Sequence, residues 1–271
     1  MTTKLKITVP ALVMLFVGTH QPLHGQNVFA VADNVNFFSP GLADKHFNNA
    51  IELYNKGNVD SATIEYESAL YYHPDHITSL LNLAFISSEK GDEVSAISYI
   101  NRVISINPTN PTAHYNLGVV YHKLGRLEEA ENYYKTAIKL DNNLVEAYSN
   151  LGRVYELSGK YNDAAGEYRN ALAVNPQFEI ALLNLGVVLL IREDFYGSLN
   201  HLQKLTEINP LRDSAYYYMA VAYYFLHDYK SSWHNLHIAR RLGAAVDVKF
   251  IDTLASAMSE QDYLRLFSQN N

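Results

Sequence analysis

Asparagine recurs at a spacing that could support binding chemistry. Five asparagines lie 34 positions apart, and a tyrosine takes the sixth place in the series: Asn48, Asn82, Asn116, Asn150, Asn184 and Tyr218. Each asparagine amide offers two donor hydrogens and one carbonyl acceptor. A row of such amides could pair with the main chain of an extended peptide, which gives affinity without demanding one sequence. The alternative is that these side chains cap local structure or hold water.

No comparable pattern supports catalysis. The chain has neither a glycine-rich phosphate loop nor a Gly-x-Ser-x-Gly nucleophile motif. Its 11 histidines are scattered, and His73 and His76 fall in a turn between repeats, where a solvated loop is expected. Glu128 and Glu129 begin a helix, where negative charge is favoured by the helix dipole. We therefore expect no catalytic residue, no metal site and no cofactor.

The composition restricts the class of protein further. The chain has 271 residues, of which 48% are hydrophobic and 18% charged, so it can bury a large core. A net charge of -7 disfavours nucleic acid as a partner, because nucleic-acid binding needs a positive field. The absence of cysteine excludes disulfides, thiolate metal sites and a lipid-modified N-terminal cysteine.

A 34-residue repeat must position the asparagines. Residues 111–144 predict two amphipathic helices, about Thr112–Leu124 and Leu127–Leu140, joined by a turn at Gly125. The same pattern continues without a gap through six repeats: 43–76, 77–110, 111–144, 145–178, 179–212 and 213–246. Residues 247–271 predict further helices that cap the C-terminal end.

Several columns of the repeat explain how its two helices could meet. The eighth position is always small, as helices in close approach require: Ala50, Ala84, Gly118, Gly152, Gly186 and Ala220. The twentieth position is also small, and a large apolar residue follows it one helical turn later, as Tyr134 follows Ala130. The turn glycine is replaced by Glu193 and His227 in the last two repeats, where we expect a different or mildly strained turn.

These columns resemble the tetratricopeptide repeat. The fourth repeat reads Tyr148-x-x-Leu151-Gly152-x-x-Tyr155, followed by Ala164, Tyr168 and Pro176. The resemblance covers residues 43–246. It implies an all-α, right-handed α-solenoid of six helix-turn-helix repeats, in which the first helices line a concave groove. The asparagine column would then form a ladder along that groove, similar to the ladder of the O-GlcNAc transferase superhelix, although asparagine is also simply common in this column of the family.

The groove positions of the fifth and sixth repeats are apolar. The residues expected there are Leu183, Val187, Tyr217, Val221 and Tyr224, next to Tyr218 of the asparagine column. A contiguous exposed apolar patch usually marks a partner site. The alternatives are that the C-terminal helices cover these residues or that they form a surface for self-association.

The N-terminal residues 1–30 resemble an export signal. Lys4 and Lys6 precede the apolar run Ile7–Val17, and cleavage is expected after Gly25 or Ala30. At about 1.5 Å per residue the run is too short to span a membrane as a helix. We therefore expect an exported protein, periplasmic or secreted, with residues 31–42 as a linker. An uncleaved segment that anchors the chain to the membrane is the alternative.

Together these features predict a non-enzymatic adaptor for protein–protein interaction. It would hold a peptide segment or a partner helix in the groove and act in envelope complex assembly, peripheral to the membrane. At the level of fold it is similar to the envelope adaptors of the family that assist pilus or secretion assembly, which also have six repeats. A self-associating, homo-oligomeric scaffold is the alternative function.

Overall fold

Successive helices pair into hairpins along the chain. The computed structural model describes residues 41–268, with side chains described up to residue 265. Every regular element in this range is an α-helix: α2 (Leu42–Asn55), α3 (Val59–Tyr72), α4 (Ile77–Glu89), α5 (Glu93–Ile106), α6 (Pro111–Lys123), α7 (Leu127–Leu140), α8 (Val145–Leu157), α9 (Tyr161–Val174), α10 (Glu179–Ile191), α11 (Phe195–Ile208), α12 (Asp213–Phe225), α13 (Tyr229–Arg241), α14 (Val248–Ala257) and α15 (Glu260–Ser268). The even-numbered helices up to α12 are the first helices of the repeats, and the odd-numbered helices up to α13 are the second helices.

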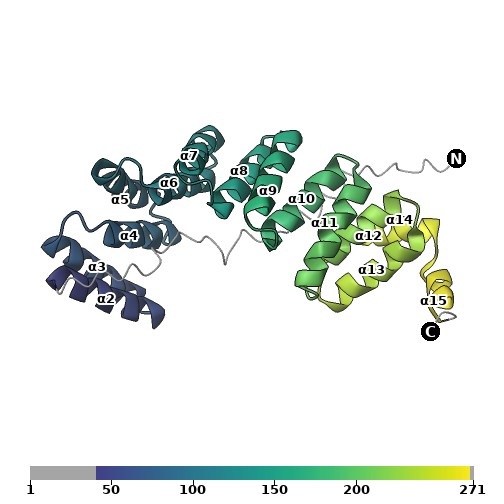
Figure 1. Cartoon of the computed structure of the whole chain (residues 1–271). Helices are drawn as coiled ribbons and strands as arrows, with labels where there is room; N and C mark the ends of the chain where they lie inside the picture. Colours follow the sequence, from purple (N-terminus) through teal and green to yellow (C-terminus); the bar gives the residue numbers. More distant parts are fainter. Residues whose placement is uncertain (1–40, 269–271) are drawn as a thin grey trace. The chain divides into compact units, whose positions relative to one another are not determined.

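The helices belong to two compact units, with described residues 41–154 and 155–268. The division falls within α8. In the N-terminal unit α2 packs on α3, α4 on α5 and α6 on α7, and each hairpin packs on the next (Figure 1). In the C-terminal unit α10 packs on α11 and α12 on α13, and α14 and α15 follow against α13. Each unit is a stack of helix hairpins, which is the arrangement of an α-solenoid.

Small residues let the two helices of a hairpin approach closely. A Cβ atom added to Gly118 of α6 would lie 2.6 Å from two ring carbons of Tyr134 on α7. Tyr134 itself is fully buried, as is the small residue Ala130 one turn before it. The repeated small and large columns therefore mark the contact between the first and second helices.

The turn between the two helices depends on a residue with left-handed backbone geometry. Gly125 has φ of 71°, and the following Arg126 donates its backbone N–H to the carbonyl of Tyr121 over 2.9 Å. Glu193 and His227 occupy the same position with φ of 60° and 61°. Of the two expected outcomes, a different turn or a mildly strained one, the structure shows the second. Both turns adopt the glycine geometry with residues that carry a Cβ, which is a strained conformation.

Glycine should therefore stabilise the fifth and sixth repeats. We expect Glu193→Gly and His227→Gly each to raise the free energy of unfolding by about 1 kcal/mol, because the left-handed strain disappears. The reverse change, Gly125→Ala, is the matched control and should cost about 1 kcal/mol. Chemical denaturation, monitored by circular dichroism, measures the free energy of unfolding of all three variants. Stabilities of the glycine variants at or below that of the parent protein would contradict the strain.

Two short helices close the C-terminal unit. Phe250 and Leu254 of α14 are fully buried in the core of this unit. The indole N–H of Trp233 on α13 donates to the carbonyl of Met258 at the end of α14 over 2.8 Å. The ring of Tyr263 on α15 lies over Trp233, with ring centroids 6.4 Å apart. The last hairpin is thus covered by α14 and α15.

The expected export segment, residues 1–30, lies outside the described residues, as does most of the expected linker 31–42. Within residues 41–268, none of the helices combines the length and apolar character that a membrane span requires.

Candidate functional site

The first helices of the N-terminal unit lie next to one another. The ring of Tyr54 on α2 lies 6.1 Å from that of Phe85 on α4. The amide of Asn150 on α8 donates to the hydroxyl of Tyr115 on α6 over 3.0 Å. These neighbouring helices are α2, α4, α6 and the part of α8 up to residue 154. We call the side on which they meet the first-helix face. It is where the resemblance places a ligand.

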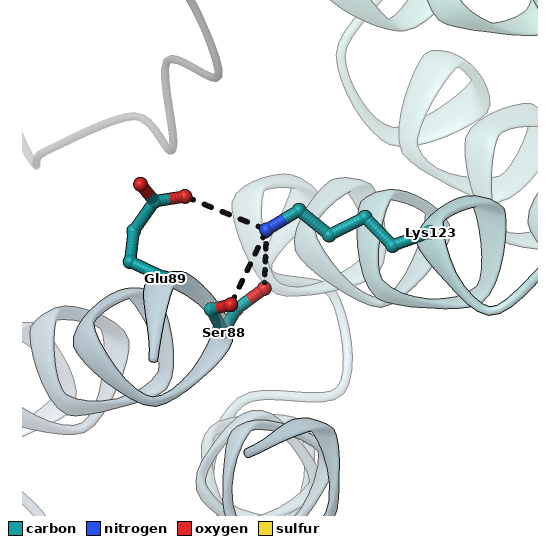
Figure 2. Close-up of polar contacts among 3 residues, drawn as sticks. All are labelled: Ser88, Glu89 and Lys123. Atoms are coloured by element: carbon teal, nitrogen blue, oxygen red, sulfur yellow. Dashed lines mark hydrogen bonds and ion pairs between the residues drawn. The ribbon is translucent and has the colours of Figure 1, made fainter. Parts of the chain in front are cut away.

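A lysine fixes the spacing of two of these helices. Figure 2 shows Lys123, at the end of α6, reaching to the last turn of α4. Its Nζ donates to the carbonyl and the Oγ of Ser88 over 3.3 and 3.0 Å and lies 3.4 Å from a carboxylate oxygen of Glu89. A cation is favoured there because the carbonyls at the C-terminal end of a helix carry partial negative charge. The contact links α6 to α4, and the ammonium group of Lys123 binds atoms of the protein itself.

The asparagine column is not evenly exposed. Asn48 is exposed, Asn150 is half-buried, and Asn184 of the C-terminal unit is also half-buried. By contrast Asn82 is 8% exposed and Asn116 is fully buried. The expectation of an open ladder is therefore wrong at these two positions. The cause is that α4 packs against both α3 and α5, and α6 against both α5 and α7.

The burial leaves amide groups without partners. Within the described part of the chain, neither the nitrogen nor the oxygen of the Asn116 amide has a hydrogen-bond partner, and the nitrogen of Asn82 has none. Asn150 is satisfied because Tyr115 stands at the fifth position of the preceding repeat. The residue at the equivalent position before Asn116 is Leu81, which offers no polar group. A buried amide without hydrogen bonds lowers the stability of the fold by about 1–3 kcal/mol. A partner such as water or a ligand would therefore stabilise the chain at Asn116.

An aromatic cluster surrounds Tyr134 in the third repeat, and the sequence patterns did not single it out. Tyr115 and Tyr134 lie with ring centroids 5.8 Å apart, and the ring of His122 lies 6.4 Å from that of Tyr134. Burial, and second the nearby Arg153, lower the pKa of His122 to about 4. Burial also raises the pKa of the Tyr115 hydroxyl. At neutral pH both groups are therefore uncharged and provide a polar but neutral lining.

The apolar positions expected in the C-terminal unit are mostly covered. Leu183, Val187, Tyr217, Tyr218 and Val221 are buried, and Tyr224 is half-buried. Their expected exposure as a patch is therefore wrong.

The physical reason for this burial is packing from two sides. The ring of Phe250 on α14 lies 5.8 Å from the rings of both Tyr217 and Tyr224, in edge-to-face contact. The two first helices α10 and α12 also pack on each other, and their side chains share one core. The alternative that the C-terminal helices cover these residues holds for Tyr217 and Tyr224.

The described residues offer no metal centre, since they contain no group of three or more His, Asp or Glu side chains placed to hold an ion.

His73 and His76 do not form a purely solvated loop. His76 is half-buried, and its Nδ1 accepts the backbone N–H of Ser79 as the cap of α4.

Comparison with known proteins gives the same architecture. Profiles of the tetratricopeptide repeat family match three consecutive segments, residues 77–110, 111–144 and 145–178. No match is found among curated proteins. The fold and the matched repeats define a helical-repeat protein, and the chain is a member of the tetratricopeptide repeat family. Proteins of this family are modules for protein interaction.

Solved structures with the same fold have low sequence identity to this chain. The structure of pilF from Pseudomonas aeruginosa is 16% identical, with a TM-score of 0.69 over 79% of this chain and 97% of that one. A tetratricopeptide repeat protein from Parabacteroides merdae is 20% identical, with a TM-score of 0.62 over 83% and 90%. YrrB, described as having an unusual peptide-binding site, is 17% identical, with a TM-score of 0.53 over 75% and 97%. These likenesses concern the fold.

Proposed function

We propose that this protein is an adaptor that binds an extended segment of a partner protein on the first-helix face of its N-terminal unit. The observation that carries the proposal is the buried amide of Asn116, which has no hydrogen-bond partner among the described residues. An extended peptide presents main-chain N–H and C=O groups at regular intervals, and these match the donors and the acceptor of an amide side chain. A partner helix satisfies its own main chain, so it would not supply these groups.

The four column asparagines of this face differ in how a partner would reach them, and Asn150 is half-buried and already bonded to Tyr115. Asn48 is open to solvent and Asn82 is close to the surface, whereas Asn116 becomes accessible only when the side chains over it move. Binding would therefore begin at Asn48 and Asn82 and then engage Asn116.

A pair of double variants tests the proposal. Partners are captured from native extract with the full chain, and the bound segment is then synthesised for titration calorimetry. Asn82→Ala with Asn116→Ala should weaken its binding about tenfold, because two or more hydrogen bonds of about 0.5–1.5 kcal/mol each are lost. The matched control is Asn101→Ala with Asn132→Ala, which changes exposed asparagines on the second helices of the same two repeats.

The control variant should bind the segment within about twofold of the parent protein, since exposed polar contacts contribute little. N-methylation of the segment's backbone should abolish binding, whereas alanine replacement of its side chains should weaken binding less. Equal affinities of the two double variants would show that the amides do not bind the partner. Asn116 would then be an amide that water satisfies.

Self-association is the second candidate function, and the structure removes one argument for it. Tyr217 and Tyr218 belong to the sixth repeat, which is expected to offer a surface for self-association, and both are buried within the chain. Lys45, Asn49 and Glu52 of α2, the first described helix, are exposed, and a polar outer face on a terminal repeat keeps helical stacks from extending. A mass that rises with concentration in light scattering would favour the scaffold over a monomeric adaptor.

We also propose that the adaptor is exported and acts in envelope complex assembly, either peripheral to the membrane or in the periplasm. The support is the pattern of residues 1–30, in which two lysines precede an apolar run and a polar stretch with small residues. The intact mass of the protein recovered from a cell-envelope fraction decides between cleavage after Gly25, cleavage after Ala30 and an uncleaved anchor. Recovery of the full-length chain from the cytosol alone would contradict export.

A further inference from the structure

A histidine caps the helix at the joint between the first and second repeats. His76 is the last residue of the first repeat and directly precedes α4. Its Nδ1 accepts the backbone N–H of Ser79 over 3.3 Å and lies 2.8 Å from the hydroxyl of the same serine. The ring also packs against Phe47 of α2, with centroids 5.1 Å apart. The His76 side chain thus links the start of α4 to the first hairpin.

This geometry requires a neutral ring. A protonated imidazole carries hydrogens on both nitrogens and can no longer accept the N–H of Ser79. Its positive charge would also lie at the N-terminal end of α4, where the helix dipole favours negative charge. The serine hydroxyl could reorient to accept from a protonated ring, but the backbone N–H would stay without its cap.

The charges around His76 act in opposite directions. Its Nε2 lies 3.8 Å from a carboxylate oxygen of Asp44 on α2, and His73 lies on its other side with ring centroids 5.9 Å apart. The side chain of His76 is 18% exposed. Burial lowers the pKa of His76, Asp44 raises it and His73 lowers it, and the net direction is downward. Asp44 therefore does not compensate for burial.

We propose that His76 is a proton-sensitive helix cap, which holds the first repeat against the second while its ring is neutral and releases this joint on acidification. The pKa is lower in the folded chain than in the unfolded one, so the unfolded chain binds more protons between the two values. The stabilisation is complete above the ordinary histidine pKa of about 6.5 and is lost as the pH falls towards and below the lowered value. The hairpin that becomes looser carries Asn48, the exposed asparagine of the first-helix face.

The chain contains its own matched control for this residue. Asn110 stands at the same place one repeat later, and its side-chain oxygen accepts the backbone N–H of Ala113 over 2.9 Å as the cap of α6. An asparagine cannot be protonated in this pH range. His76→Asn therefore keeps a helix cap and removes the titration, whereas His76→Ala removes the cap at every pH.

Hydrogen exchange of the full chain tests the cap. Protection of the α3 and α4 amides is measured relative to the intrinsic rate at each pH, so that the pH dependence of the exchange chemistry cancels. Between about pH 7.5 and about pH 5, protection in the parent protein should fall about fivefold, the size expected for loss of a helix cap. His76→Asn should change less than about twofold over the same range.

His76→Ala should already show the lower protection at neutral pH, while α10 and α12 in the C-terminal unit serve as an internal reference for all three proteins. The proposal is overturned if the parent protein and His76→Asn lose protection equally, or if the parent protein loses none. The comparison between these two proteins stands even if the alanine variant folds poorly. It is also independent of peptide binding, because no ligand is present.

Discussion

Replacement of Trp233 by alanine is expected to lower the free energy of unfolding of the C-terminal unit by about 4 kcal/mol. This residue is the only tryptophan of the chain, and its side chain is fully buried. Its ring packs against His237 and Tyr263, and its indole N–H satisfies the carbonyl of Met258. The alanine variant leaves a cavity between α13 and α15 and a carbonyl without its donor.

Two further variants separate the causes of this loss. Trp233→Phe keeps most of the ring contacts and removes the N–H, so it should lower the free energy of unfolding by about 1–2 kcal/mol. Tyr196→Ala removes an aromatic ring that is 75% exposed and should change stability by less than about 0.5 kcal/mol. Circular dichroism during chemical denaturation gives the stabilities, and hydrogen exchange identifies the affected helices. A cost below about 1 kcal/mol for the alanine variant would show that α15 does not depend on Trp233.

The helices could be predicted from the sequence because the repeat encodes them locally. Each hairpin needs a small residue, a large apolar partner and a turn, and all three fall within 34 consecutive residues. The observed α6 and α7, Pro111–Lys123 and Leu127–Leu140, lie within one residue of the predicted bounds at each end. The turns at Glu193 and His227 keep their shape without glycine because the same backbone hydrogen bond closes them, from Asp194 to Leu189 and from Asp228 to Tyr223, over 2.9 and 3.0 Å.

The exposure of the site could not be predicted from one repeat. Whether the amide of Asn116 or that of Asn150 has a partner depends on a residue at the fifth position of the preceding repeat, Leu81 or Tyr115. That column contains both apolar and hydroxyl-bearing residues, so the repeat pattern does not fix whether a polar partner is present. The burial of Tyr217 likewise depends on Phe250, which lies in a helix outside the repeat pattern. Burial is a property of the stack, whereas the repeat pattern describes the single hairpin.

Replacement of Gly118 by valine should have the second large effect. We expect it to lower the free energy of unfolding of the N-terminal unit by about 3 kcal/mol. The added Cβ alone would lie 2.6 Å from the ring of Tyr134, and two further methyl groups increase the overlap. The ring cannot withdraw easily because it is fully buried, with Tyr115 and His122 beside it. The hairpin must therefore open, and the contact of Lys123 with Ser88 should weaken with it.

A glycine in open space provides the matched control for this prediction. Gly166, in the middle of α9, has nothing within 4 Å of an added Cβ. Gly166→Ala should therefore stabilise the chain by about 0.5–1 kcal/mol through helix propensity alone. At position 118 alanine gains the same propensity but overlaps Tyr134, so the two alanine variants should differ in sign. Chemical denaturation measures both variants. If both alanine variants were stabilising, Tyr134 would shift at little cost, and the small eighth column would not limit the approach of the two helices.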